Sequence, residues 1–184
     1  MQCRLILIRH GESILGSEGR LAGNIDTPLT PQGRLQIRRL SRKFKGSRVQ
    51  HIYSSDLSRC RSTAEILAEG KPVSFTRRLR ELNFGAWEGC THGQLLRRDP
   101  SRYRKWIADP RSAAPPRGET LAQLAARVRS FARTVIRCHP EETVALVTHA
   151  GPIRVLLARR LQDFWSIDVP LGSMHRLVLP EVAP

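Results

Sequence analysis

The chain has 184 residues, 40% of them hydrophobic, which is enough for one substantial core. No apolar stretch approaches the roughly 20 residues that cross a bilayer, and the N-terminus has no signal-peptide pattern. These features exclude an integral membrane protein and predict one soluble, cytoplasmic domain over residues 1–184.

The net charge is strongly positive, at +15, with 31 basic and 16 acidic residues. Such a surplus can displace counterions from nucleic-acid phosphates. The basic residues are dispersed along the chain, however, only 4 of the 31 are Lys, and aromatic residues make up only 5% of the composition. Because single-stranded nucleic acids bind on aromatic platforms, we expect no specific nucleic-acid partner. A basic nucleic-acid-binding module remains the non-enzymatic alternative.

The predicted elements of the first half alternate between strands and helices. Residues 3–8 form an apolar run typical of a buried strand. Thr30 followed by Pro31 marks the start of a helix that continues to about residue 45. The next predicted elements are a strand over residues 49–53, a helix over 57–68 and a strand over 71–75.

The second half continues this alternation. Residues 92–111 divide into short helices at Pro100 and Pro110, and a loop over residues 112–118 is expected to border the pocket. Apolar residues at helical spacing predict a helix over residues 119–138. The last predicted elements are a strand over 143–148, a helix over 153–161 and a strand over 174–179. This alternation predicts an α/β fold, a three-layer α/β/α sandwich with a mainly parallel central sheet.

Two histidines stand where a predicted strand ends. Residues 9–12 read Arg-His-Gly-Glu and follow the first apolar run, and His149 follows the strand over residues 143–148. A single histidine at such a place is most often a capping or packing residue. Ligands of open α/β sheets bind at the carboxyl ends of the strands, however, so the repeated pattern favours a shared site.

Two further segments bring charged side chains toward the same end of the sheet. Residues 53–65 read YSSDLSRCRSTAE and carry Arg59 in the first turns of a predicted helix. Residues 80–89 read RELNFGAWEG and place Glu81 and Glu88 in a loop whose glycines allow close packing. The four segments together predict a site for an anion beside a nucleophile.

In this order, the four segments resemble the histidine phosphatase superfamily, in its phosphoglycerate-mutase-like branch, along nearly the whole chain. Within that branch the chain looks most like α-ribazole phosphatases of the cobalamin pathway. That likeness includes the loop at residues 80–89 and Asp99-Pro100, Trp106, Asp109-Pro110 and Pro116-x-Gly118-Glu119. The resemblance implies a phosphoglycerate-mutase-like fold and a phosphomonoester hydrolase, and it favours α-ribazole 5′-phosphate as the substrate. A broad-specificity phosphatase of small phosphorylated metabolites and, less favoured, a phosphoglycerate mutase are the alternatives.

Phosphoryl transfer requires positive charge around the phosphorus and a nucleophile in line with the leaving group. The resemblance implies that His10 is the covalent nucleophile and forms a phosphohistidine. Arg9 and Arg59 are expected to bind the phosphate, because a guanidinium forms two parallel bonds to its oxygens. His149 is expected to donate to the transferring oxygens.

Glu81 matches the proton donor of the family, which acts first as an acid and then as a base. To do so, the carboxyl group must hold its proton near neutral pH, which burial against Phe84 or Trp87 favours and neighbouring arginines oppose. Glu88 is the competing candidate, although its place after Trp87 matches a structural position of the family. Glu12 is expected to support the site without touching substrate.

The chain departs from the family pattern near the phosphate. Members often have an asparagine six residues after the motif histidine, where this chain has Gly16. Asn24 is the candidate to replace that phosphate contact, although its side chain could equally satisfy the backbone of a turn. This departure, with the lack of long insertions, favours a hydrolase over a mutase.

The remaining titratable residues are not expected to take part in catalysis. No spacing among His, Cys, Asp and Glu resembles a metal cage, so we expect a metal-independent enzyme without a cofactor. Among the other histidines, His92 follows the loop of Glu81 and could touch substrate, but a structural role is the favoured interpretation. The residues expected to be structural are His51, His139 and His175, together with the reduced thiols of Cys3, Cys60, Cys90 and Cys138.

Overall fold

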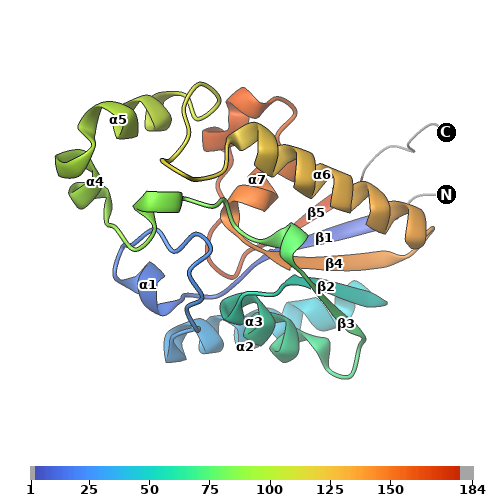
Figure 1. Cartoon of the computed structure of the whole chain (residues 1–184). Coiled ribbons are helices and arrows are strands. Elements are labelled where there is room, and N and C mark those ends of the chain that lie inside the picture. Colours follow the sequence, from blue (N-terminus) through green and yellow to red (C-terminus); the bar gives the residue numbers. More distant parts are fainter. Residues whose placement is uncertain (1–2, 179–184) are drawn as a thin grey trace.

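A five-stranded sheet in the order β3-β2-β4-β1-β5 forms the centre of the molecule (Figure 1). The structure is a computed structural model that describes residues 3–178. Four strands are mutually parallel, and the edge strand β5 runs antiparallel to β1. The strands are β1 (Arg4–Arg9), β2 (His51–Ser55), β3 (Val73–Thr76), β4 (Thr143–Thr148) and β5 (Met174–Val178). The predicted mainly parallel α/β sheet is confirmed.

The register of the two central strands positions the two motif histidines. All six residues of β4 are buried, as expected for a parallel strand covered on both faces. Arg9 pairs with Thr148, and the backbone N–H of His10 donates to the carbonyl oxygen of Thr148 at 3.1 Å. His10 and His149 therefore leave adjacent strands at the same level.

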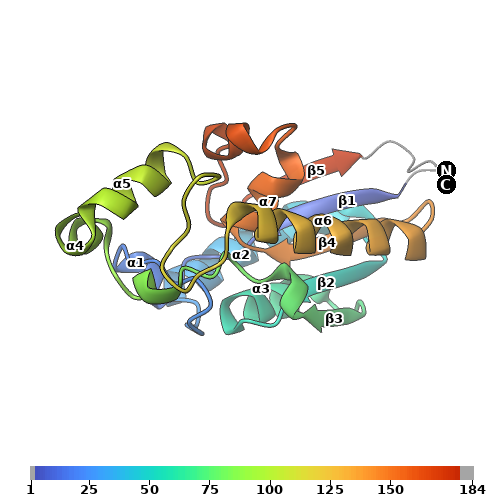
Figure 2. The same cartoon turned by 45° about the horizontal axis from the view of Figure 1, so that its top comes forward.

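Helices cover both faces of the sheet (Figures 1 and 2). One face is covered by α2 (Pro31–Phe44) and α3 (Ser58–Ala68), and the other by α6 (Leu121–Cys138) and α7 (Ala150–Leu157). Thr30 caps α2 by accepting a hydrogen bond from the backbone N–H of Gly33, with Pro31 at the first position. Both features of α2 were predicted. The helices on the two faces of the sheet give the expected three-layer sandwich.

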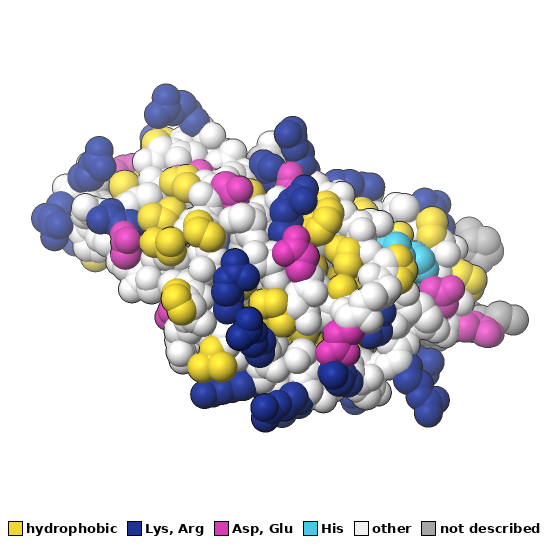
Figure 3. Space-filling view, turned by 90° about the horizontal axis from the view of Figure 1, so that it is seen from below, with side chains coloured by type: hydrophobic (Ala, Val, Ile, Leu, Met, Phe, Trp, Pro, Cys, Tyr) yellow, Lys and Arg dark blue, Asp and Glu magenta, His cyan; other side chains and the backbone are white. Residues whose placement is uncertain are grey.

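The outer side of the layer formed by α2 and α3 is exposed and polar. Basic residues on the exposed side of α2 include Arg38, Arg39, Arg42 and Lys43. On the face drawn in Figure 3, basic side chains lie scattered among acidic, hydrophobic and neutral ones. On this face they do not form one continuous stripe.

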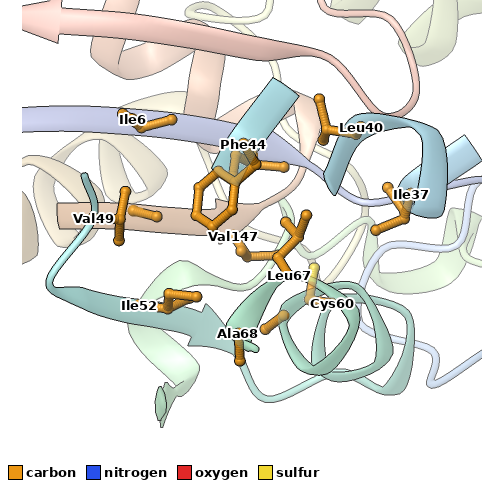
Figure 4. Close-up of a cluster of buried hydrophobic side chains, with 13 residues drawn as sticks. Ile6, Ile37, Leu40, Phe44, Val49, Ile52, Cys60, Leu67, Ala68 and Val147 are labelled. Carbon is orange, nitrogen blue, oxygen red and sulfur yellow. The ribbon is translucent and has the colours of Figure 1, made fainter. Parts of the chain in front are cut away.

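The inner side of the same layer packs tightly on the sheet (Figure 4). Ile37 and Phe44 of α2 and Leu67 of α3 are almost fully buried against Ile52 and Val147 of the strands. Burial of each such side chain stabilises the fold by roughly 1.5–3 kcal/mol. This contact fixes α3 on the sheet and so fixes the position of Arg59 in its first turn.

Two short helices, α4 (His92–Arg98) and α5 (Pro100–Ala108), extend beyond the carboxyl ends of β1 and β4 (Figures 1 and 2). The helix break at Pro100 was predicted, and Pro100 occupies the first turn of α5. Trp87, Tyr103 and Trp106 join this extension to Leu124 of α6 through a third buried cluster. The extension therefore forms a wall beside the end of the sheet where the histidines lie.

The structure differs from the predictions at several boundaries. The helix after His149 begins at Ala150, three residues earlier than predicted. Pro152 lies in its first turn, where the backbone N–H has no partner within the helix, so a proline there does not prevent the earlier start. Residue 179 of the last predicted strand lies outside the described residues. Short helices that were not predicted are α1 (Ile14–Ser17), η1 (Lys45–Ser47), η2 (Arg77–Leu79), η3 (Gly85–Trp87) and η4 (Leu161–Ser166). No helix within residues 3–178 is both long and apolar enough to span a bilayer.

Candidate active site

A cavity of about 400 Å³ opens at the carboxyl ends of β1 and β4. Arg9, His10, Arg59 and Glu81 all line it, although they come from three separate segments of the chain. Its volume is that of a site for a small molecule. The structure thus brings four of the predicted site residues around one space.

The hydrogen bonds of His10 leave one ring nitrogen available for attack. Nδ1 lies 2.7 Å from the carbonyl oxygen of Gly11. A carbonyl only accepts, so Nδ1 carries the hydrogen and donates it, and Nε2 keeps its lone pair. Burial, followed by the positive charges of Arg59 and Arg9, lowers the pKa of His10 well below 6.5. The ring is therefore neutral near pH 7, as a nucleophile requires.

Arg59 is buried at the start of α3 and is held by three protein groups. Its Nη1 and Nη2 donate to the carbonyl oxygens of Ile25 and Gly23 at 2.9 and 2.6 Å. Its Nε donates to Nδ1 of His149 at 3.3 Å. Since a guanidinium has five N–H groups, two remain for an anion in the cavity.

The sequence predicts that His149 donates to the phosphate oxygens, and the structure places its ring next to Arg59 and His10. The side chain is fully buried and does not line the cavity. Nδ1 accepts from Arg59, so the neutral ring carries its hydrogen on Nε2, which lies 3.0 Å from the hydroxyl of Ser55. Its ring packs edge-on against His10, with centroids 5.0 Å apart. His149 therefore contacts Arg59 and His10, which line the cavity, without lining it itself.

Arg9 follows the buried part of β1 and is largely free to bind an anion. Its Nη1 donates to the carbonyl oxygen of Val169. Its Nε is buried and has no hydrogen-bond partner among residues 3–178. A buried N–H group without a partner is costly, so a ligand oxygen at this position would satisfy it.

Glu81 lies against the start of α7. Its Oε1 accepts from the backbone N–H groups of Leu82 and Gly151, at 2.8 and 3.1 Å. A Cβ at Gly151 would lie 2.3 Å from Oε1, so only glycine allows this approach. The carboxyl group is thereby placed on the wall of the cavity that contains His10.

Asn24 and Glu88 lie elsewhere. Asn24 does not line the cavity with His10 and instead borders a separate surface depression, so its predicted phosphate contact is not supported by its position. Glu88 accepts from the backbone N–H groups of Asn24 and Phe84, at 2.8 and 3.1 Å, and ties two loops together. Glu12 accepts from the hydroxyl of Thr30 at 2.7 Å and supports the loop after β1.

Aromatic side chains line the same cavity as the charged residues and form what we call the aromatic wall. We use this name for four residues that line the cavity, Phe84, Trp106, Phe164 and Trp165. Trp106 packs edge-on against Phe84 and Trp165, with centroids 5.6 and 5.2 Å apart. Arg154 lies over the ring of Trp165 at 5.2 Å and also lines the cavity. Phe84, Trp106 and the adjacent pair Phe164 and Trp165 come from three separate parts of the chain, so no local pattern groups them.

The remaining histidines contact protein groups. His92 lines the cavity, and its Nδ1 is bonded to the hydroxyl of Tyr103. His139 bridges Tyr53 and Glu142, at 3.0 and 2.8 Å. His51 and His175 contact serine hydroxyls. The four cysteines are free thiols, and residues 3–178 contain no group of three or more potential metal ligands.

Residues 5–182 match the sequence model of the Histidine phosphatase superfamily (branch 1). The chain belongs to this superfamily. It is similar to phosphoserine phosphatase 1 of Hydrogenobacter thermophilus, with 33% identity over 97% of this chain and 87% of that protein. It is also similar to the adenosylcobalamin/α-ribazole phosphatase of Salmonella typhimurium, with 32% identity over 97% of this chain and 91% of that protein.

Solved structures of the superfamily share the fold. A putative α-ribazole-5′-P phosphatase from Escherichia coli superposes with a TM-score of 0.89 at 27% identity, covering 98% of this chain and 92% of that one. A mycobacterial glucosyl-3-phosphoglycerate phosphatase in complex with VO3 gives a TM-score of 0.87 at 31% identity, covering 94% and 91%. This chain is therefore a phosphatase of the histidine phosphatase superfamily with a phosphoglycerate-mutase-like fold.

Proposed function

We propose that this protein hydrolyses phosphomonoesters through a phosphohistidine on Nε2 of His10. The observation that carries the proposal is the hydrogen bond from Nδ1 of His10 to the carbonyl oxygen of Gly11, in a cavity that Arg9 and Arg59 also line. It leaves a neutral nitrogen with a lone pair beside two cations that bind phosphate oxygens.

In the first step, Nε2 of His10 attacks the phosphorus, and the bond between phosphorus and the ester oxygen breaks. The leaving oxygen takes a proton from Glu81, and the alcohol departs. The phosphorylated ring is stabilised because its Nδ1 hydrogen remains bonded to Gly11. Arg9 and Arg59 balance the negative charge of the transferring group.

In the second step, water attacks the phosphohistidine and the bond between nitrogen and phosphorus breaks. The Glu81 carboxylate accepts the proton of this water, inorganic phosphate forms, and the neutral His10 ring is restored. His149 acts on both steps by holding Arg59 through Nδ1 and by packing against the His10 ring. No step requires a metal ion or cofactor.

The aromatic wall supports a substrate whose leaving group carries a planar ring. Phosphoserine and phosphoglycerates have polar leaving groups that gain little from Trp106 and Trp165, whereas a heteroaromatic nucleoside can pack against these rings. We therefore propose α-ribazole 5′-phosphate as the substrate, in agreement with the names of several relatives. A broad specificity for small phosphorylated metabolites is the second candidate, since other relatives are named phosphoserine phosphatases.

Detection of the intermediate tests the chemistry. Enzyme mixed with substrate and quenched in alkali, where phosphohistidine survives, is expected to carry one phosphoryl group on the peptide that contains His10. His10→Asn is expected to abolish both the label and turnover, while His175→Asn, a change in the edge strand β5, leaves both intact. Full turnover by His10→Asn would contradict the proposal.

A substrate panel tests the specificity. The value of kcat/KM for α-ribazole 5′-phosphate is expected to exceed that for phosphoserine by at least tenfold, or about 1.4 kcal/mol. Trp165→Ala is expected to reduce this preference because it removes one ring of the aromatic wall. Equal values for both substrates in the native enzyme would support broad specificity, and fast interconversion of 2- and 3-phosphoglycerate would support a mutase.

We propose a cytoplasmic enzyme whose partner is a small phosphorylated metabolite. Basic side chains scattered over the face in Figure 3 support non-specific attraction of anions rather than a specific nucleic-acid site. A binding assay with unrelated duplexes at physiological salt is expected to give no sequence preference.

A further inference from the structure

The segment that carries Glu81 has no regular structure of its own. Residues 80–84 lie between η2 and η3 and belong to no helix or strand. The position of Glu81 therefore depends on the groups that satisfy the backbone of this segment. A general acid must come within about 3 Å of the leaving oxygen, so this backbone has to be held firmly.

Arg127 of α6 supplies that support with all five of its N–H groups. Its Nη1 donates to the carbonyl oxygens of Arg78 and Arg80, at 3.0 and 2.8 Å. Its Nη2 donates to the carbonyl oxygen of Glu81 at 2.9 Å. Nε and Nη2 donate to the two carboxylate oxygens of Glu119, at 2.7 and 2.8 Å. One side chain thus binds the carbonyl groups of Arg80 and Glu81, which lie before and after the Cα atom of Glu81.

Glu119 extends the same support to the other side of Glu81. The backbone N–H of Asn83 donates to Oε2 of Glu119 at 3.3 Å, and the N–H of Glu119 donates to the carbonyl oxygen of Asn83 at 2.8 Å. The side chains of Arg127 and Glu119 are 24% and 14% exposed, and both border the separate surface depression that Asn24 also lines. The segment is held before and after Glu81.

Arg127 itself does not line the cavity. We propose that Arg127, fixed by Glu119, is a positioning residue that places the general acid Glu81 against the leaving group. This inference rests on the proposed function, in which Glu81 protonates the leaving oxygen. Only a planar fork with five donors can serve three carbonyl groups and a carboxylate, so lysine keeps the charge but loses most of the bonds.

The test compares two substrates that differ in their need for an acid. The leaving group of 2,4-dinitrophenyl phosphate departs without a proton, whereas that of phenyl phosphate needs one. The parameter is kcat/KM, which reports the step in which the ester bond breaks. Glu81→Gln, Arg127→Lys and the control Arg133→Lys, an exposed position on the same helix, are measured with both substrates.

We expect Glu81→Gln and Arg127→Lys to lower kcat/KM for phenyl phosphate by at least ten times more than for 2,4-dinitrophenyl phosphate. A misplacement of about 1 Å reduces the rate by on the order of 100-fold. Arg133→Lys is expected to match the native enzyme on both substrates. A structural role alone would lower both values equally, and such a result, or no loss at all, would overturn the inference.

The two proposals fail in different ways. If Glu81→Gln lowers kcat/KM equally for both substrates, Glu81 is not the acid and the proposed function is wrong on that point. If Glu81→Gln lowers kcat/KM more for phenyl phosphate than for 2,4-dinitrophenyl phosphate, and Arg127→Lys lowers the two values equally, only the positioning inference fails. Should Arg127→Lys unfold below the assay temperature, Glu119→Gln gives the same comparison, because it weakens the anchor of Arg127. Equal loss on both substrates in Glu119→Gln then overturns the inference.

Discussion

Nε of Arg59 donates a hydrogen bond to Nδ1 of His149, over 3.3 Å, in a region from which solvent is excluded. The bond fixes the tautomer of His149 and the orientation of the guanidinium at once. Because the burial of both groups is nearly complete, the loss of this acceptor would leave an N–H group of Arg59 without a partner, at a cost of roughly 1–3 kcal/mol.

Two substitutions of His149 separate its roles. The side-chain amide of an asparagine at position 149 would lie near the place of Nδ1, and that of a glutamine would lie near the place of Nε2. We expect His149→Asn to keep Arg59 in place and to retain inhibition by inorganic phosphate within a few-fold. His149→Gln is expected to weaken it by about tenfold or more, equivalent to 1.4 kcal/mol. The inhibition constant of phosphate measures the effect, and the opposite ranking would mean that Nε2 contacts the phosphate directly.

The buried histidines also make the stability depend on pH. Burial is the first cause of the lowered pKa of both His10 and His149, and the positive charge of Arg59 is the second. Between the lowered folded pKa and the unfolded value of about 6.5, the unfolded chain binds more protons than the folded one. The free energy of unfolding therefore falls as pH decreases below about 6.5, by up to about 1.4 kcal/mol per pH unit for each ring.

Denaturant unfolding between pH 7.5 and 5 measures this slope. His10→Asn is expected to remove about half of the contribution of the pair. His51, whose pKa burial also lowers, adds a smaller effect of the same sign. Asp56, whose pKa is lowered by its hydrogen bonds to Arg80, loses its contribution only below about pH 4. A flat profile above pH 5 would show that the rings titrate as in an unfolded chain.

Gly151 allows the approach of Glu81 to α7, and alanine would not. The added Cβ would lie 2.3 Å from Oε1 of Glu81, so the carboxyl group must move. We expect Gly151→Ala to lower kcat/KM for phenyl phosphate by roughly 10- to 100-fold while the melting temperature stays within a few degrees. Gly93→Ala in α4 is the matched control, since its Cβ meets only Nη1 of Arg97, at 3.6 Å. Native activity in Gly151→Ala would argue against the proposed place of Glu81.

The loop after β1 packs closely against the start of α2 at two glycines, Gly11 and Gly33. A Cβ at Gly33 would lie 2.1 Å from the carbonyl oxygen of Glu12, and that backbone has little room to move. We expect Gly33→Ala to destabilise the fold by about 1–3 kcal/mol, as overpacking does. Gly46→Ala, where a Cβ meets nothing within 4 Å, is expected to leave the melting temperature nearly unchanged. Equal melting temperatures for the two variants would contradict this explanation.

The chemistry proposed for His10 needs no metal ion. Hydrolysis of phenyl phosphate is expected to continue at its full rate in excess chelator, and added magnesium is expected to leave kcat/KM unchanged. Loss of activity in chelator that only a divalent metal restores would require a different mechanism. The same assay on His10→Asn gives the background rate.

The sequence alone determined the alternation of strands and helices and the place of the main motifs. Periodicity, the cap at Thr30 and the proline at Pro100 are local signals, because each depends on hydrogen bonds and backbone angles within a few residues. The motif at residues 9–12 was also readable, since a strand followed by a charged loop predicts a site at the carboxyl end of a sheet. Family resemblance then supplied the roles of His10, Arg59 and Glu81.

Only the tertiary structure decided how these side chains face one another. His149 has the expected place in the sequence, but its ring is turned toward Arg59 and Ser55, a choice set by three different elements. Asn24 is near the motif in sequence and yet outside the cavity, because Glu88 binds its backbone. The aromatic wall and the contacts of Arg127 join residues far apart in the chain. Hydrogen bonds and ring packing depend on distance in space, which no local pattern of residues encodes.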